Sequence, residues 1–201
     1  MNYRQKDLLP DFHEMSKKEN NIDALNKYFP KFSLLRKTKR ALQDFLNDDL
    51  YLLEKWSVIL KEYTPKIAKK QNKISWKDLA DRVYSEYIRL SECDEKWYCT
   101  CPCCWVKVHW TIAQNMHYRS RICLKFRFED NNCHAGCMKC NVILNWNYRN
   151  YYLFMVKMYW EEYERYLWEN DELVDLSIEW YQTNILEWFD KILYFKNMLI
   201  N

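Results

Sequence analysis

Two pairs of cysteines constrain this 201-residue chain more than any other feature of its sequence. The four residues are Cys101, Cys104, Cys137 and Cys140. Each C-x-x-C pair brings two thiolates within bonding distance of one ion, so the two pairs together suit a single tetrahedral zinc. The spacing therefore predicts a structural zinc ion that crosslinks two distant segments. Cys99 and Cys103 offer a competing register for the first pair.

The remaining composition indicates an intracellular protein with an ordinary core. The chain is 49% hydrophobic, which is enough to bury a core at this length. No uninterrupted apolar stretch reaches the roughly 18 residues of a membrane span, and the first ten residues are charged, so neither a membrane segment nor a secretory signal is predicted. The odd total of nine cysteines favours zinc and reduced thiols over disulfides. We expect a cytoplasmic location.

Apolar residues at three- and four-residue steps predict helices on both sides of the cysteine pairs. The stripes fall in residues 42–63, 79–90, 151–168 and 173–199. Residues 98–135 instead contain short alternating runs, at 105–110 and 124–128, that predict strands. The fold class predicted is α+β and predominantly helical, with a small zinc-bound core flanked by N- and C-terminal helices.

This pattern divides the chain into three predicted parts. They are a lysine-rich helical region at 1–74, a core with the cysteine pairs at 75–150, and an acidic helical extension at 151–201. The net charge is only +3, but residues 101–150 hold seven Lys/Arg against two acidic residues, whereas 151–201 hold four against ten. A basic core next to an acidic extension is compatible with nucleic-acid binding by the core.

A lysine cluster between Lys61 and Lys77 adds to this charge pattern. The four lysines predicted to contact DNA are Lys66, Lys69, Lys70 and Lys73. Lysine and arginine clusters neutralise phosphates and supply much of the affinity for DNA. The alternative is that these lysines form only a solvated surface.

Several short motifs around the cysteine pairs follow one another in a fixed order. They are Tyr87-Ile88-Arg89-Leu90, His109-Trp110, His117-Tyr118-Arg119, Arg127-Phe128, Asn132-Cys133-His134, Cys140-Asn141 and Asn147. With these motifs, residues 79–198 of the chain resemble the NinG/Rap recombination endonucleases of bacteriophages. The family text reads approximately YIRL, CxxCG, HW, DAGHYxxR, LRFxExNxH, QCxxCN and SGN. Several independent matches in the correct order argue against chance.

The resemblance implies a metal-dependent DNA endonuclease with a ββα-metal, or HNH-like, core. Such an enzyme cuts branched recombination intermediates, such as Holliday junctions and D-loops, in a phage-infected bacterial cell. It implies two cofactors, a structural Zn²⁺ and a catalytic Mg²⁺ or Mn²⁺. Branched DNA is the expected partner, and a homodimer and other recombination proteins stay open as further partners. An HNH enzyme acting on linear duplex is a weaker alternative, against which the Tyr87–Leu90 match argues.

The same resemblance assigns catalytic roles to three residues. His117 would be the general base, since an imidazole with an ordinary pKa of roughly 6.5 suits proton transfer near neutral pH. Asn132 would orient the His117 ring by a hydrogen bond, and Asn141 would bind the catalytic ion. His134 is a second candidate ligand of that ion, or contacts phosphate, or caps a turn. The alternatives for His117 are a zinc ligand or a packed core histidine.

Arginines near His117 are candidates for phosphate binding because a guanidinium can hold two phosphate oxygens at once. Arg119 and Arg127 match family positions and are predicted to bind DNA. Arg121 has no family match, and we assign it to a solvated strand end or an ion pair.

The chain also departs from the family text. Gln114 replaces the aspartate of DAGH, and a neutral amide binds a hard cation more weakly than a carboxylate does. Trp105 stands where the family has glycine after the first cysteine pair, and Asn145-Trp146 replace Ser-Gly. Gly136 is the only glycine in the chain. These changes leave a second hypothesis open, a zinc-stabilised DNA-binding protein with weak or lost cleavage.

Overall fold

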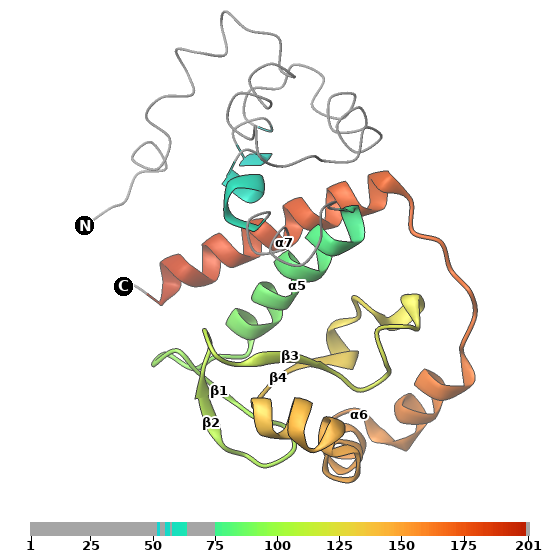
Figure 1. The fold of residues 1–201 in the computed structure, drawn as a ribbon. Helices are drawn as coiled ribbons and strands as arrows, with labels where there is room; N and C mark the ends of the chain where they lie inside the picture. Colours follow the sequence, from blue (N-terminus) through green and yellow to red (C-terminus); the bar gives the residue numbers. More distant parts are fainter. Residues whose placement is uncertain (1–51, 53–54, 57, 64–74, 200–201) are drawn as a thin grey trace, which may run out of the picture. The chain divides into compact units, whose positions relative to one another are not determined.

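The computed structural model describes residues 52, 55–56, 58–63 and 75–199 (Figure 1). The main elements are α5 (Trp76–Ser91), β1 (Tyr98–Thr100), β2 (Lys107–His109), β3 (Gln114–His117), β4 (Cys133–Gly136), α6 (Tyr148–Glu169) and α7 (Ile178–Met198). The strands form two separate two-stranded sheets. A mainly helical α+β fold is therefore confirmed. Within the described residues, no helix has both the length and the apolar character that crossing a membrane requires.

Backbone contacts divide the chain into two compact units. One unit comprises Asp81–Ser177 and Glu187–Asn201, and the other comprises Met1–Ala80 and Ile178–Leu186. In the second unit, the ring of Trp56 packs edge-on against Trp76, with 5.4 Å between ring centroids. All the site residues below belong to the first unit. The predicted three-part division stays a prediction, because its first part lies almost wholly outside the described residues.

Both sheets are antiparallel hairpins with defined registers. In β1–β2, Tyr98 pairs with His109, and in β3–β4, Gln114 pairs with Gly136. Successive side chains of a strand point to opposite faces, so residues two apart share a face. His117 and the residue two before it, Asn115, thus lie on one face of β3.

Close approach of the two strands explains the single glycine. A Cβ atom on Gly136 would lie 1.9 Å from the Sδ atom of Met116. The φ angle of Gly136 is not in the left-handed region. Space for the Met116 side chain, and not backbone freedom, therefore requires glycine here.

One predicted strand is wrong. Residues 124–128 do not form a strand, and Leu124–Phe126 instead form a short 3₁₀ turn. The Phe126 carbonyl accepts a hydrogen bond from the Asn132 side chain, at 2.8 Å. The buried Asn132 side chain thus bonds a carbonyl that a neighbouring strand would otherwise have bonded. The predicted strand at 105–110 is confirmed in part, as β2.

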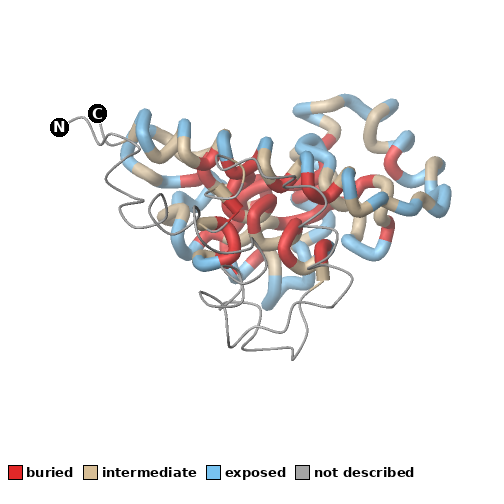
Figure 2. The backbone as a smooth tube through the Cα atoms, turned by 90° about the horizontal axis from the view of Figure 1, so that it is seen from above, coloured by how far each residue is buried: buried red, intermediate tan, exposed pale blue. Residues whose placement is uncertain are grey.

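Helix α6 supplies much of the buried cluster around the hairpins, whereas α5 and α7 contact the segment before β4 and each other. Tyr84 and Tyr87 of α5 donate hydrogen bonds to the Asp130 carboxylate, at 3.0 and 2.7 Å. Trp188 of α7 packs on the Tyr84 ring, with 4.7 Å between centroids. Figure 2 shows how exposed and buried positions alternate along the helices, as the apolar stripes predict. The α6 helix is interrupted at Trp160, where φ is 66°.

The family motifs on α5 and β2 contact each other. The Arg89 guanidinium donates to the Trp110 carbonyl at 2.9 Å and lies 5.6 Å from the centre of the Trp110 ring. The Cys99 thiol donates to the Arg89 carbonyl at 3.1 Å. These contacts attach the β1–β2 hairpin to α5. The family motifs that contain Arg89 and Trp110 therefore contribute to packing.

Candidate functional site

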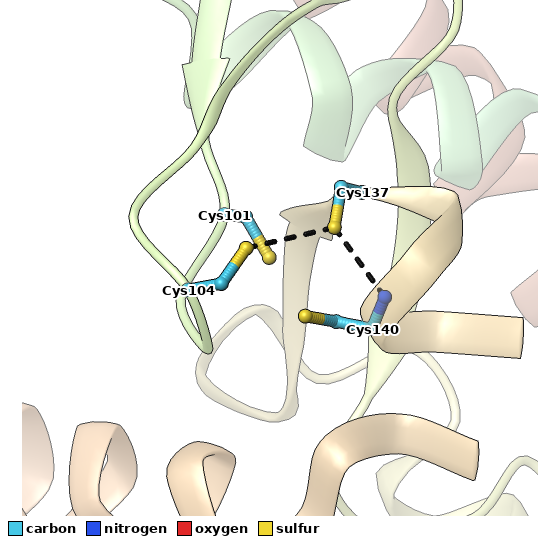
Figure 3. Close-up of side chains that lie close together, drawn as sticks. All are labelled: Cys101, Cys104, Cys137 and Cys140. Atoms are coloured by element: carbon cyan, nitrogen blue, oxygen red, sulfur yellow. Dashed lines mark hydrogen bonds between the residues drawn. The ribbon is translucent and has the colours of Figure 1, made fainter. Parts of the chain in front are cut away.

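The two cysteine pairs meet as predicted. The turn after β1 carries Cys101 and Cys104, and the turn after β4 carries Cys137 and Cys140. All four sulfur atoms lie within 4.8 Å of one another and point toward a common centre (Figure 3). The Sγ atoms of Cys104 and Cys137 are 3.7 Å apart. Four soft sulfur donors in this arrangement fit a structural zinc ion.

The alternative first pair of zinc ligands, Cys99 and Cys103, is wrong. Cys99 points to the Arg89 carbonyl, and Cys103 donates to the carbonyl of Trp146 at 3.6 Å. Neither sulfur belongs to the four-sulfur cluster. The first pair is therefore Cys101 and Cys104, as the C-x-x-C spacing indicates.

The thiols of the cluster are in a protonation state that a metal ion would change. Burial raises the pKa of Cys104 to about 12 and also raises the pKa of Cys140. A hydrogen bond with Cys103 lowers the pKa of Cys101 to about 4. Cys104 and Cys140 thus hold protons near neutral pH, and zinc must displace these protons when it binds. Zinc affinity should consequently fall with decreasing pH.

A pocket of about 390 Å³ contains three of the other predicted site residues. Its lining consists of Asn115, His117, Ser120, Arg121, Ile122, Arg127, Asn141 and Trp146. The volume lies within the range of small-molecule sites, about 300–1,000 Å³. None of the lining residues is acidic. The pocket is therefore basic and suits an anionic group such as a phosphate.

The ring of His117 is buried at one wall of this pocket. Its Nε2 atom lies 3.0 Å from the Arg127 carbonyl. A carbonyl only accepts hydrogen bonds, so Nε2 carries the proton of the neutral ring and Nδ1 keeps its lone pair. Burial, and then the charge of Arg121, lowers the pKa of His117 to about 3, while the carbonyls of Arg127 and Asn115 act in the opposite direction. His117 is thus neutral near pH 7, and its low pKa makes it a weaker base than the ordinary imidazole that the prediction assumed.

Asn132 has a different role from the predicted one. Its side chain is fully buried, and its Oδ1 atom accepts a hydrogen bond from the Arg119 amide at 2.6 Å. Its Nδ2 atom donates to the carbonyls of Arg119 and Phe126, at 3.1 and 2.8 Å. The prediction that Asn132 orients the His117 ring is wrong, since the Arg127 carbonyl makes that bond. Asn132 instead fixes the loop that follows His117.

Asn141 lies in the pocket and contacts the residue that replaces the family aspartate. Its Nδ2 atom donates to Oε1 of Gln114 at 2.7 Å. This bond uses the amide nitrogen of Asn141 and leaves its Oδ1 atom as an oxygen donor for a metal ion. Gln114 itself does not line the pocket. The amide of Gln114 therefore orients Asn141.

Asn115 is a pocket residue that sequence reasoning missed. Its Oδ1 atom is buried, and among the described residues it has no hydrogen-bond partner. Asn115 and His117 share one face of β3, and both line the pocket. The oxygens of Asn115 and Asn141 are neutral donors that fit a divalent ion, although they hold a hard cation more weakly than carboxylates do. The two-residue step back from His117 was the signal that could have found Asn115.

His134 is not in this pocket. Its ring is buried, its Nδ1 atom lies 2.6 Å from a Glu92 carboxylate oxygen, and its face stacks on Tyr159. The other Glu92 oxygen accepts the Ala135 amide at 2.6 Å. Binding of the catalytic ion by His134 finds no support in this arrangement, because β4 directs the ring toward Glu92. His134 attaches the β4 strand to the end of α5.

The three arginines near His117 have different surroundings, and their contacts with DNA stay a prediction. Arg119 pairs with Asp171 at 3.0 Å and lies 4.2 Å from the centre of the Trp168 ring, away from the pocket lining. Arg127 lines the pocket but binds Asp81 with two nitrogen atoms. Arg121 is exposed on the pocket, and its guanidinium has no ion-pair partner within the described part of the chain. The residue predicted to lie in solvent or in an ion pair thus presents an exposed guanidinium at the pocket. Lys66, Lys69, Lys70 and Lys73 lie outside the described residues.

A solvent-accessible basic pocket with a neutral histidine, next to four cysteines that could hold a metal ion, defines the class of site in this α+β protein. The family model described as Bacteriophage Lambda NinG protein matches residues 60–197. The chain belongs to this family. Comparison with curated proteins found no match, and comparison with solved structures found none.

Proposed function

We propose that this protein is a zinc-stabilised, metal-dependent DNA endonuclease that hydrolyses phosphodiester bonds in branched recombination intermediates, such as Holliday junctions and D-loops. The observation that carries the proposal is the neutral His117 ring, which lines one pocket together with Arg121, Arg127 and Asn141. Membership of the NinG family supports it.

The local topology is compatible with a ββα-metal, HNH-like core. The β3–β4 hairpin carries His117, and the helical turn that follows β4 carries Asn141. Between them, Cys137 and Cys140 would attach this turn to the β1–β2 hairpin through zinc. The zinc ion would thus fix the position of the turn that carries Asn141.

The pocket residues have distinct roles in the proposed hydrolysis. A water molecule attacks phosphorus and gives its proton to Nδ1 of His117, and the bond from phosphorus to the leaving oxygen breaks. The carbonyls of Arg127 and Asn115 stabilise the imidazolium that forms. Arg121 binds the non-bridging oxygens of the phosphate. A divalent ion held by Asn115 and Asn141 would supply charge neutralisation at the phosphate.

A second function has one observation in its favour. None of the pocket residues is acidic, so the affinity for Mg²⁺ is expected to be low. A zinc-stabilised protein that binds branched DNA without cutting it would have the same metal centre and the same basic pocket. The two functions differ only in whether the bound DNA is cleaved.

Cleavage assays separate the two functions. Zinc-loaded protein is incubated with labelled four-way, three-way and linear DNA, with Mg²⁺, Mn²⁺ or no added ion. We expect cleavage of branched DNA that depends on the added ion, and stronger activity with Mn²⁺, whose affinity for nitrogen and amide donors is higher. His117→Ala should lower the rate about 10²- to 10⁴-fold.

His109→Ala is the matched control, because His109 bonds Thr111 at 2.8 Å and does not line the pocket. Its activity should equal that of the unmodified protein. Binding without cleavage under every condition would establish the second function. Unchanged cleavage by His117→Ala, with zinc content intact, would show that another group is the base.

A further inference from the structure

Trp146 has a backbone conformation that its residue type disfavours. Its φ and ψ angles are 67° and −3°, and the neighbouring Asn145 and Asn147 also have positive φ. Asparagine tolerates the left-handed region, whereas for most other side chains it costs about 1–2 kcal/mol. Strain of this kind at a pocket is grounds for seeking a function of the side chain.

Contacts with the zinc-binding turns hold this strained segment in place. The Cys103 thiol donates to the Trp146 carbonyl at 3.6 Å. The Asn147 side chain donates to the Cys140 sulfur at 3.5 Å. The backbone at Trp146 and Asn147 is thus held by both cysteine-containing turns, through Cys103, which is outside the four-sulfur cluster, and through Cys140, which belongs to it.

The indole itself is available for binding. Trp146 lines the same pocket as His117, and 41% of its surface is exposed. Among the described residues, its ring has no aromatic or cationic partner. The neighbouring Trp105 differs, because its ring contacts Phe154 and Lys157. The indole of Trp146 is thus a large flat surface in a pocket whose lining is mainly polar.

The chemistry around the indole favours a nucleotide over an apolar ligand. Arg121 offers a cation for a phosphate, and Ile122, which is 93% exposed, adds a second apolar group. Aromatic side chains beside cationic groups bind single-stranded nucleic acid, because a base stacks on the ring while the phosphate contacts the cation. A paired base is already stacked, and unstacking it costs a few kcal/mol.

We propose that Trp146 stacks on an unpaired base next to the scissile phosphate, and that this contact selects DNA with unpaired nucleotides at a branch point over linear duplex. The inference rests on the proposed DNA substrate. It assigns to this chain a specificity residue at a position where the family text has glycine.

Binding of two DNA probes to the zinc-loaded full chain, with no added divalent ion, tests the inference. One probe is a three-way junction with two unpaired nucleotides at the branch, one of them 2-aminopurine, and the other is a linear duplex. Trp146→Gly should weaken junction binding roughly tenfold to a hundredfold and duplex binding less than about twofold. It should also abolish the quenching of 2-aminopurine that indole stacking produces. Trp146→Phe should keep most of both effects.

Trp105→Gly is the matched control, because Trp105 also has positive φ, at 61°, but lies outside the pocket lining. It should leave both probes unaffected. Equal losses on junction and duplex, or unchanged quenching in Trp146→Gly, would overturn the inference. Loss of junction preference in a protein that cleaves nothing would refute the nuclease and retain the stacking contact. If Trp146→Gly leaves the junction preference unchanged in a protein that cleaves DNA, the nuclease is retained and the stacking contact is refuted.

Discussion

The substitution Asn132→Ala tests whether Asn132 acts on the loop after His117 instead of on the histidine itself. The Asn132 side chain makes three hydrogen bonds, all of them to backbone atoms of Arg119 and Phe126. Alanine removes all three and leaves one amide and two carbonyls without these partners. The loop that carries Arg121 would then lose its main attachment.

The expected magnitude follows from these contacts. A typical hydrogen bond contributes about 1 kcal/mol net, so three contribute roughly 3 kcal/mol. For a domain of this size, 1 kcal/mol corresponds to about 2–4 °C in melting temperature. Asn132→Ala should therefore lower the free energy of unfolding by about 3 kcal/mol and the melting temperature by roughly 6–12 °C.

Urea denaturation of the zinc-loaded protein measures this loss. The matched control is Asn131→Ala, since Asn131 is the adjacent residue and is exposed. The control should stay within about 0.5 kcal/mol of the unmodified protein. If Asn132→Ala is as stable as the control but loses cleavage, the assignment as a loop residue is refuted and a direct catalytic role is restored.

Three further perturbations follow from the structure. Cys137→Ser should reduce zinc below one ion per chain and unfold the β hairpins, because a structural zinc ion contributes folding energy. Elemental analysis measures the zinc content, and circular dichroism measures the unfolding. Cys93→Ser is the control and should keep its zinc. Gly136→Ala should lower the free energy of unfolding by about 1–3 kcal/mol, since the added Cβ displaces Met116; an equally stable variant would show that the strands can separate. Trp105→Gly should be more stable than Trp105→Ala by about 1 kcal/mol, because only glycine adopts a positive φ without strain. Equal melting temperatures of the two variants would show that the backbone at residue 105 is not strained.

Spacing along the sequence was sufficient for the metal centre and for part of the pocket. A C-x-x-C pair fixes its own geometry within one turn, so two pairs locate a zinc site whatever lies between them. His117 and Asn141 were predicted from their positions in the family motifs, and the structure brings both into one pocket.

The sequence did not indicate in which direction the site side chains point or which distant acidic residues bind them. Arg119 and His134 match family positions, yet Asp171 and Glu92 bind them away from the pocket. Nothing in the local sequence around Arg119 or His134 indicates these pairings, which depend on how α6 and α5 pack against the hairpins. Asn115 was missed for another reason: the sequence places it on the His117 face of the strand, but its buried, unpaired oxygen depends on tertiary packing.

The two tryptophans that stand in place of family glycines show which interactions determine the local backbone. Trp105 and Trp146 both keep positive φ, the conformation that glycine adopts most easily, although neither side chain favours it. Trp105 directly follows Cys104, and the Trp146 carbonyl accepts the Cys103 thiol. The contacts around the zinc-binding turns thus outweigh a local preference of about 1–2 kcal/mol per residue. The geometry of the pocket consequently depends on the metal centre, and zinc loss should release the Trp146 turn and separate Asn141 from His117 before the helices unfold.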